Sequence, residues 1–261
     1  MIGRSLHVLN LILLTSILFV VLFVAVLYFW LNQDLPQLPK NLQHINLSLP
    51  TEIYSSDGES IKILGERHPI ALEDIAPYFT KAIIAVEDSR FYRHSGIDHK
   101  GLVRALWTNL RQKRIAQGGS TITQQLSKNL FFSFERNWVR KIKELLIAFQ
   151  LEASFSKGQI LQAYCNQIYF GSGAYGVEEA AQVYFRKRAK DLTLYQAALL
   201  AGLPNSPNNA NPFAHYERAM QRTKYVLNRM VSENLISFNE KELALQSDID
   251  LVKPRVASNP N

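Results

Sequence analysis

Two adjacent carboxylates, Glu87 and Asp88, directly follow the apolar stretch 81–86, which reads KAIIAV. A carboxylate at the end of a buried helix loses part of its hydration, which raises its pKa towards the range of a general base near neutral pH. The alternative is that the pair only marks the point where a helix reaches solvent. The string EDSRFYRHSG is more specific than either carboxylate alone, and it adds Phe91, His94 and Gly96.

A second polar cluster lies in the segment 118–129, which reads GGSTITQQLSKN. Two glycines before a Ser-Thr helix start leave backbone N–H groups free to bind an anion. An ordinary helix cap followed by a solvated polar face explains the pattern equally well. Side chains at i, i+3, i+4 and i+7 share one face of the helix, and here they are Thr121, Gln124, Gln125 and Lys128.

A third cluster lies in the helical segment 136–152, where Arg136, Arg140 and Glu144 follow one another at four-residue spacing. An exposed face with ion pairs is one interpretation, but arginine N-terminal to glutamate is the weaker orientation for such pairs. Two guanidinium groups instead suit phosphate oxygens, which they hold in fork geometry. Glu144 would then orient one guanidinium or a substrate hydroxyl.

Carboxylates and cations together predict sugar chemistry with a phosphorylated leaving group. Glycoside hydrolysis also uses paired carboxylates, but its leaving group is an alcohol that is protonated and needs no cations around it. The cationic residues therefore favour transfer over hydrolysis, and a lysozyme-like lytic glycosidase is the alternative enzyme. A catalytically inactive scaffold is the alternative of another class.

Composition places these clusters in an ordinary globular protein. The chain has 261 residues, of which 47% are hydrophobic and 20% charged. The single cysteine, Cys165, excludes a disulfide framework or a cysteine-rich zinc site within one chain. The net charge of +7 favours nucleic acid, anionic lipid or a phosphorylated substrate as partner.

An uncharged run of 24 residues, 8–31, is long enough to span a bilayer, which needs about 20 apolar residues. Arg4 and His7 precede the run and Tyr28, Phe29 and Trp30 close it, which predicts a cytoplasmic N-terminus. A cleavable signal peptide would have a shorter apolar region and a small-residue cleavage site. We expect a retained single-pass anchor with the rest of the chain outside the cytoplasm, which argues against nucleic acid as partner.

The remaining chain predicts a short β-hairpin followed by helices. Three prolines in 32–50 suit a linker, and two β-prone stretches flank Asp57-Gly58 within 51–64. Helical spacing then dominates, so the fold class is mainly α. The expected helices lie near 79–93, 98–113, 120–132, 136–154, 157–168, 176–185, 191–202 and 213–235.

Residues 51–230 resemble the family 51 glycosyltransferases, the peptidoglycan polymerases found alone and as the first domain of bifunctional penicillin-binding proteins. Cys165 departs from the leucine that the family usually has there. Five motifs come in the family's order: Glu87, Asp88, Phe91, His94 and Gly96; 119–125 with Lys128 and Asn129; 140–144; Lys157, 160–161, Tyr164 and Asn166; and Arg222, 226–227 and Met230.

The resemblance implies a lysozyme-like helical head beside a smaller, membrane-facing jaw. Glu87 would deprotonate the acceptor lipid II, Lys128, Arg136 and Arg140 would neutralise the departing pyrophosphate, and Glu144 would position these cations or the donor. Substrate contacts would come from Ser120, Thr121, Gln124, Gln125 and Asn129, and support from Asp88, Phe91, His94, Gly96, Lys141, Tyr164 and Asn166. The implied organisation is a tail at 1–7, an anchor at 8–31, a linker at 32–50, a transglycosylase domain at 51–235 and a C-terminal tail at 236–261.

The resemblance also sets expectations for partners and cofactors. We expect lipid II, the lipid-linked glycan chain and the membrane as partners, together with penicillin-binding transpeptidases and division or elongation proteins. No cofactor is required, no metal-ligand spacing is present, and a Mg²⁺ or Mn²⁺ ion would arrive with the substrate. The segment 130–134 would dip into the lipid surface or pack in the core. No K-T-G element occurs in these 261 residues, so no transpeptidase activity is expected.

Overall fold

The computed structural model describes residues 2–42, 51–54, 57, 60–64, 67–112, 118–132 and 137–252. Predictions on other residues, among them the glycine of the hairpin turn, Arg136 and the last two residues of the segment 130–134, lie outside the described residues. The chain forms two compact units, residues 1–38 and 39–261.

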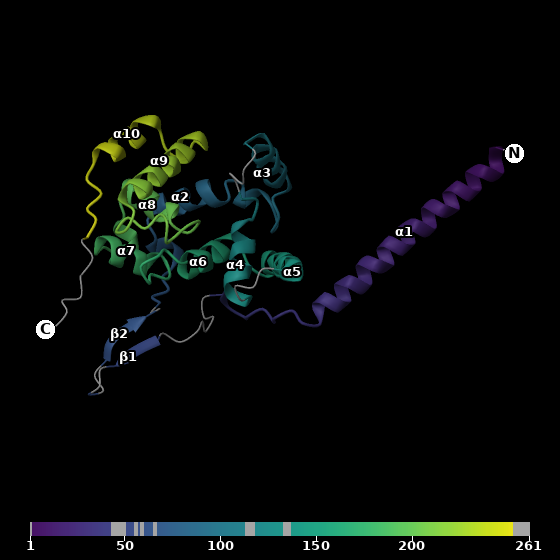
Figure 1. The fold of residues 1–261 in the computed structure, drawn as a ribbon, viewed down its shortest axis with the longest axis horizontal. Coiled ribbons are helices and arrows are strands. Elements are labelled where there is room, and N and C mark those ends of the chain that lie inside the picture. The colour runs from purple at the N-terminus through teal and green to yellow at the C-terminus, as the bar shows by residue number, and fades with distance from the viewer. Residues whose placement is uncertain are drawn as a thin grey trace. The chain divides into compact units, whose positions relative to one another are not determined.

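The first unit consists mainly of helix α1, Ile2–Asn32 (Figure 1). The hydroxyl groups of Thr15 and Ser16 donate to the carbonyl of Ile12 one turn earlier, so both polar side chains are satisfied within the helix. Among the described residues, no helix is both long and apolar enough to cross a membrane.

The second unit begins with a hairpin and continues as a helical bundle, which agrees with the predicted mainly α fold. Strands β1 and β2 pair antiparallel, with a register irregularity between Ile53 and Tyr54. The division into head and jaw stays a prediction. The elements are β1 Thr51–Tyr54, β2 Ser60–Leu64, α2 Pro77–Glu87, α3 His99–Gln112, α4 Ile122–Phe131, α5 Trp138–Ser154, α6 Lys157–Gln167, α7 Val177–Phe185, α8 Leu194–Gly202, α9 Tyr216–Ser232 and α10 Phe238–Gln246, with short 3-10 turns at Leu72–Asp74, Phe91–Arg93 and Ala189–Asp191.

Local sequence explains where several of these helices begin. Pro77 occupies the first position of α2, where its missing N–H costs nothing. Capping boxes start α6, α8 and α10, because in each case a Ser or Thr accepts from a backbone N–H and a Gln or Glu three residues later returns the bond. The α10 box lies in the segment 236–261 that was predicted only as a tail.

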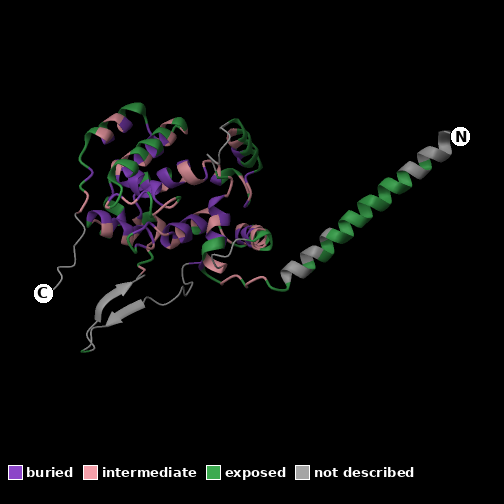
Figure 2. Cartoon of the chain, in the orientation of Figure 1, coloured by how far each residue is buried: buried purple, intermediate pink, exposed green. Residues whose placement is uncertain are grey.

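The core is built from two sets of packed helices. Helix α2 packs against α8 and α9, and α4 packs against α5 and α6. Every residue of α8 except Tyr195 is buried, and Figure 2 shows buried residues gathered through the bundle. Gly202 allows α8 and α9 to approach closely, because a Cβ there would lie 2.9 Å from Cγ of Arg222.

One predicted helix ends earlier than expected. The periodicity predicted a helix over 79–93, but α2 ends at Glu87, because Asp88 has an extended backbone with φ −159° and ψ 74°. The chain then turns through the 3-10 segment Phe91–Arg93. This break places Glu87 and Asp88 at the end of a buried helix. The interpretation of Glu87 as a partly desolvated base requires that position.

Two glycines in the loop after α6 differ in how closely other atoms pack around them. Gly173 and Gly176 have similar positive φ angles of 80° and 85°, but a Cβ on Gly176 would lie 2.8 Å from the carbonyl oxygen of Asn166. No described atom lies within 4 Å of a Cβ on Gly173.

We therefore expect Gly173→Ala to lower the free energy of unfolding by about 1–2 kcal/mol through backbone strain alone. Gly176→Ala adds steric overlap with the backbone and should cost roughly 1–3 kcal/mol more. Denaturant unfolding followed by circular dichroism measures both. Equal losses in the two variants would contradict the close packing of Gly176.

Candidate active site

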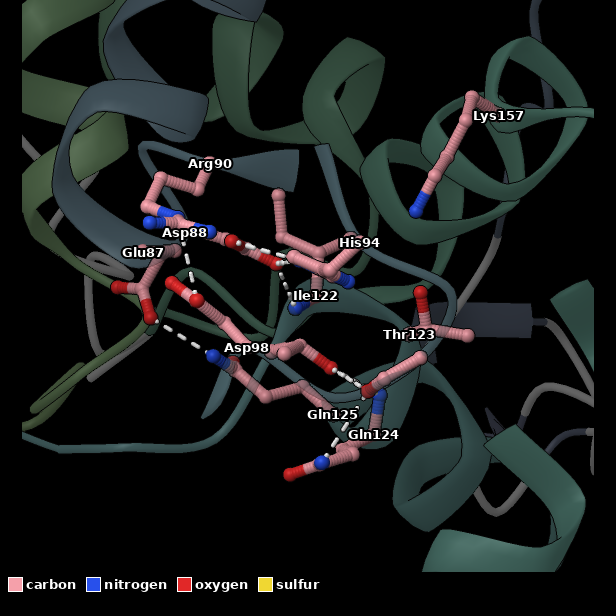
Figure 3. Close-up of polar contacts among 12 residues, drawn as sticks. Glu87, Asp88, Arg90, His94, Asp98, Ile122, Thr123, Gln124, Gln125 and Lys157 are labelled. Atoms are coloured by element: carbon pink, nitrogen blue, oxygen red, sulfur yellow. Dashed lines mark hydrogen bonds and ion pairs between the residues drawn. The ribbon is translucent and has the colours of Figure 1, made fainter. Parts of the chain in front are cut away.

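Glu87 is the last residue of α2, and its two carboxylate oxygens have different surroundings. Oε2 accepts a hydrogen bond of 2.9 Å from Nε2 of Gln125, drawn in Figure 3. Oε1 is buried and has no hydrogen-bond partner among the described residues. One oxygen is thus held by the protein and the other remains able to accept a proton.

Burial raises the pKa of Glu87 above its usual value of 4.5, because the carboxylate loses hydration at the end of the apolar helix. The hydrogen bond from Gln125 and the positive charges of Arg222 and Lys128 act in the opposite direction and lower that pKa. Desolvation is the largest of these effects, so the net shift is upward. A raised pKa with a free oxygen is the combination that a general base needs.

The amide of Gln125 is itself oriented by a buried tyrosine. The Tyr164 hydroxyl donates to Oε1 of Gln125 at 3.1 Å, so the amide NH₂ faces Glu87. Tyr164 is fully buried in α6, and burial raises the pKa of its hydroxyl well above 10. The phenol therefore stays protonated and remains a donor. Sequence assigned support to Tyr164 and substrate contact to Gln125, and the structure brings both to Glu87.

Asp88 links the end of α2 to the start of α4. Both of its carboxylate oxygens lie 3.0 Å from Nε2 of His94, and Oδ2 also accepts from the backbone N–H of Ile122 (Figure 3). The side chains of Asp88 and His94 are only 3% and 4% exposed. At the helix start 120–122, the backbone N–H of Ile122 is thus occupied by the protein's own Asp88, and an external anion there stays a prediction.

The carbonyl of Gly96 holds the other side of the same helix start. It accepts from the Thr121 hydroxyl at 2.7 Å and from Nε2 of Gln124 at 3.1 Å. Thr121 also caps α4 by accepting from the N–H of Gln124. Both side chains are buried in contacts within the protein, and their substrate contacts stay a prediction. Gly96 has a φ of 94°, which favours glycine at this turn.

The cations of α5 surround a buried glutamate. Glu144 is 2% exposed and pairs with Arg140 and Lys141, four and three residues earlier in the helix. Lys141 also donates to the Ser120 hydroxyl at 3.2 Å, which joins α5 to the loop before α4. The expected contact of Glu144 with a neighbouring guanidinium is present. Arg136, the third predicted cation, lies outside the described residues.

A pocket in front of Glu87 contains charged residues that sequence reasoning did not assign to the site. Asp88, Ser120 and Thr121 line it together with Glu87. The unassigned residues are Asp98 and Arg104 near the start of α3, Asn205 in the loop after α8, and Arg222 and Arg229 on α9. Arg222 belongs to the fifth motif, which was the only sequence signal for these residues.

The remaining predicted residues lie around the site. Phe91 is fully buried, with the ammonium of Lys157 4.3 Å from its ring centroid. Asn166 exchanges two hydrogen bonds with the backbone of Ile70 and thus holds the segment that follows the hairpin. Lys128 and Asn129 are exposed near the end of α4. Among the described residues, no cluster of three His, Cys, Asp or Glu side chains is placed to hold a metal ion.

Comparison with known proteins decides the family. A sequence model described as Transglycosylase matches residues 57–231. The chain belongs to the transglycosylase family. This agrees with the resemblance to family 51 and supports a peptidoglycan glycosyltransferase activity. Five ordered motifs had predicted this membership before any fold was known.

Individual proteins are also similar in sequence to this chain. The chain is 45% identical over 218 residues to penicillin-binding protein 1A of Neisseria gonorrhoeae, covering 82% of this chain and 27% of the relative. It is 45% identical over 238 residues to penicillin-binding protein 1A of Aquifex aeolicus, covering 90% and 33%. This transglycosylase thus spans a third or less of these relatives. A crystal structure of penicillin-binding protein 1A from Haemophilus influenzae matches 81% of this chain and 22% of that chain, at 27% identity and a TM-score of 0.48.

The Tyr164–Gln125 contact predicts a measurable effect on Glu87. Tyr164→Phe removes the donor that orients the amide, so the hydrogen bond to the Glu87 carboxylate weakens. We expect the pKa of Glu87 to rise further, because the hydrogen bond from Gln125 is one of the interactions that lower it. Carbon-13 NMR titration of glutamate-labelled protein measures it, with Glu87→Gln identifying the signal.

Tyr184→Phe is the matched control, because Tyr184 is also fully buried and donates to the carbonyl of Phe170. Both variants remove one buried hydroxyl and should lower the free energy of unfolding by similar amounts. Tyr184→Phe should leave the pKa of Glu87 unchanged. An unchanged Glu87 pKa in Tyr164→Phe, or equal shifts in the two variants, would contradict the orienting role.

Proposed function

We propose that this transglycosylase polymerises lipid II into β-1,4-linked glycan strands and that Glu87 is its general base. The observation that carries the proposal is the free, buried Oε1 of Glu87, on a carboxylate whose pKa is raised by burial. Two cations act on this carboxylate: Arg222 on α9, which lines the pocket, and Lys128 on α4 both lower its pKa.

In the proposed reaction, Glu87 accepts the proton of the 4-hydroxyl of the N-acetylglucosamine on the acceptor lipid II. The resulting oxygen nucleophile attacks C1 of N-acetylmuramic acid at the reducing end of the growing chain. The C1–oxygen bond to pyrophosphate breaks, the anomeric centre inverts, and undecaprenyl pyrophosphate leaves with the bonding electrons. Tyr164 and Gln125 keep the other oxygen of Glu87 occupied, so that only Oε1 takes part.

Cations on both sides of Glu87 suit two substrates that each carry a pyrophosphate. Lys128, Arg136 and Arg140 are proposed to neutralise the departing pyrophosphate, as the resemblance implies. Arg140 and Lys141 are already held by the buried Glu144, so little reordering is needed when phosphate binds. On the opposite side, Arg222 is proposed to face the acceptor. No cofactor is proposed, and a divalent ion would enter with the pyrophosphate.

We further propose that the apolar segment 8–31 anchors the enzyme in the bacterial cytoplasmic membrane, with the catalytic unit outside. Support comes from the uncharged sequence and from its helical backbone within α1. Exposed apolar side chains on α3, among them Trp107 at 69% exposure, suit contact with the same membrane. Anchoring would keep the pocket at the surface where lipid-linked substrates lie.

Replacing the proposed base tests the function directly. Glu87→Gln keeps the size of the side chain and the acceptor for Gln125 but removes the base, so polymerisation of labelled lipid II should fall by at least about a hundredfold. Gel separation of the glycan strands measures it. Glu73→Gln, at an exposed position in the 3-10 turn Leu72–Asp74, is the control and should polymerise at the wild-type rate.

Residual polymerisation above about a tenth of the wild-type rate in Glu87→Gln would rule out Glu87 as the base. Release of soluble muropeptides from purified cell wall by the wild type, without polymer, would assign a lytic glycosidase. Inactivity of the wild type in both assays would favour a scaffold.

A further inference from the structure

A second pocket lies on the other side of the Asp88–His94 pair. Asp88 lines the pocket in front of Glu87, whereas His94 lines the second one, and Asp98 borders both. The second pocket is otherwise formed by Arg90 and Arg93, by the start of α3 and by Phe149 of α5. The two pockets thus share Asp98 and otherwise have different lining residues.

Positive charge predominates in this second pocket. Arg90, Arg93 and Lys100 line it, and Asp98 is its only carboxylate. Asp98 lies 3.1 Å from Nε of Arg90 and offsets that one charge. Arg93 and Lys100 are exposed, so their charged groups remain accessible to a ligand. The pocket thus has the charge to bind an anion.

A buried nitrogen with no partner points to the same ligand class. The His94 side chain is 4% exposed, and its Nε2 is held by Asp88. Its Nδ1 is buried and has no hydrogen-bond partner among the described residues, although His94 lines the pocket. A buried polar atom without a partner is costly. An oxyanion that accepts a hydrogen bond from Nδ1–H would satisfy it.

Apolar side chains adjoin this cationic pocket. Phe149, which forms part of its wall, is 46% exposed. Helix α3 starts at the pocket with His99 and Lys100, and its next turns expose Leu102, Val103, Leu106, Trp107 and Leu110 at between 52% and 69%. A free anion would gain no binding free energy from these apolar side chains. The hydrocarbon chain of a lipid anion would bury them, which favours binding.

We propose that this pocket binds the phosphate headgroup of an anionic membrane phospholipid, with its acyl chains along the exposed side of α3. Arg93, Lys100 and the free guanidinium nitrogens of Arg90 hold the phosphate oxygens, and His94 donates through Nδ1. The site shares Asp98 with the proposed lipid II pocket, but neither Glu87 nor Arg222 lines it.

Native mass spectrometry of the full chain in detergent tests this site, with phosphatidylglycerol and phosphatidylcholine of identical acyl chains as probes. We expect one phosphatidylglycerol to bind at least about tenfold more tightly than phosphatidylcholine, since only the former carries net charge. The double variant Arg93→Gln/Lys100→Gln should lose that preference. Lys81→Gln/Lys224→Gln removes the same charge from exposed positions elsewhere and should retain it.

Equal affinity for the two lipids, or the same preference in both double variants, would overturn the proposal. Displacement of phosphatidylglycerol by millimolar inorganic phosphate would reveal a free-phosphate site and would overturn the lipid assignment. A raised KM for lipid II in Arg93→Gln/Lys100→Gln, measured without phospholipid, would assign the pocket to substrate instead. This last result leaves the proposed polymerase activity intact, so the two proposals fail separately.

Discussion

The arrangement of the site depends on one buried carboxylate. Asp88 receives His94 on one side and the backbone N–H of Ile122 on the other, and so fixes the end of α2 against the start of α4. A buried carboxylate is stable only when hydrogen bonds replace its lost hydration, and both donors here come from other elements. Because Glu87 is the adjacent residue, this contact sets where the proposed base can point.

The pKa of Glu87 depends on two opposing effects, which are desolvation and nearby positive charge. Burial alone would favour the protonated acid, whereas Gln125, Arg222 and Lys128 favour the carboxylate. The net shift of the pKa is upward, so desolvation outweighs these charges and makes the carboxylate a stronger base. Gln125, oriented by Tyr164, also decides which oxygen can react. Its amide occupies Oε2 of Glu87 and leaves Oε1 for the pocket.

Sequence predicted the parts of this structure that depend on short-range patterns. The mainly α fold follows from helical spacing, helix α2 was correctly expected to bury its apolar stretch before Glu87, and the pairing of Arg140 with Glu144 follows from their four-residue separation. The early end of α2 could not be predicted, because Asp88 leaves the helix to satisfy contacts with residues 6 and 34 positions away. Helix α10 was missed although its Ser237–Glu240 capping box is visible in the sequence.

Long-range placement explains the other differences. For the polar face of α4, sequence left a binding surface and an ordinary helix cap open, and it gave no sign that Thr121 and Gln124 contact the Gly96 carbonyl, which only the tertiary fold brings there. Arg104 and Arg229 reach the pocket from α3 and α9, and neither belongs to a local motif. Sequence therefore identified residues able to do the chemistry, and the fold determined which of them adjoin Glu87.

The most direct test of this account is the pH dependence of kcat/KM for lipid II polymerisation, which reports ionisations of the free enzyme and substrate. The account predicts that kcat/KM falls on the acid side with an apparent pKa above 4.5, the usual value for glutamate, and that this pKa equals the one obtained by titrating the Glu87 carboxyl itself. An acid limb at or below 4.5, or one that differs from the Glu87 titration, would contradict Glu87 as the base.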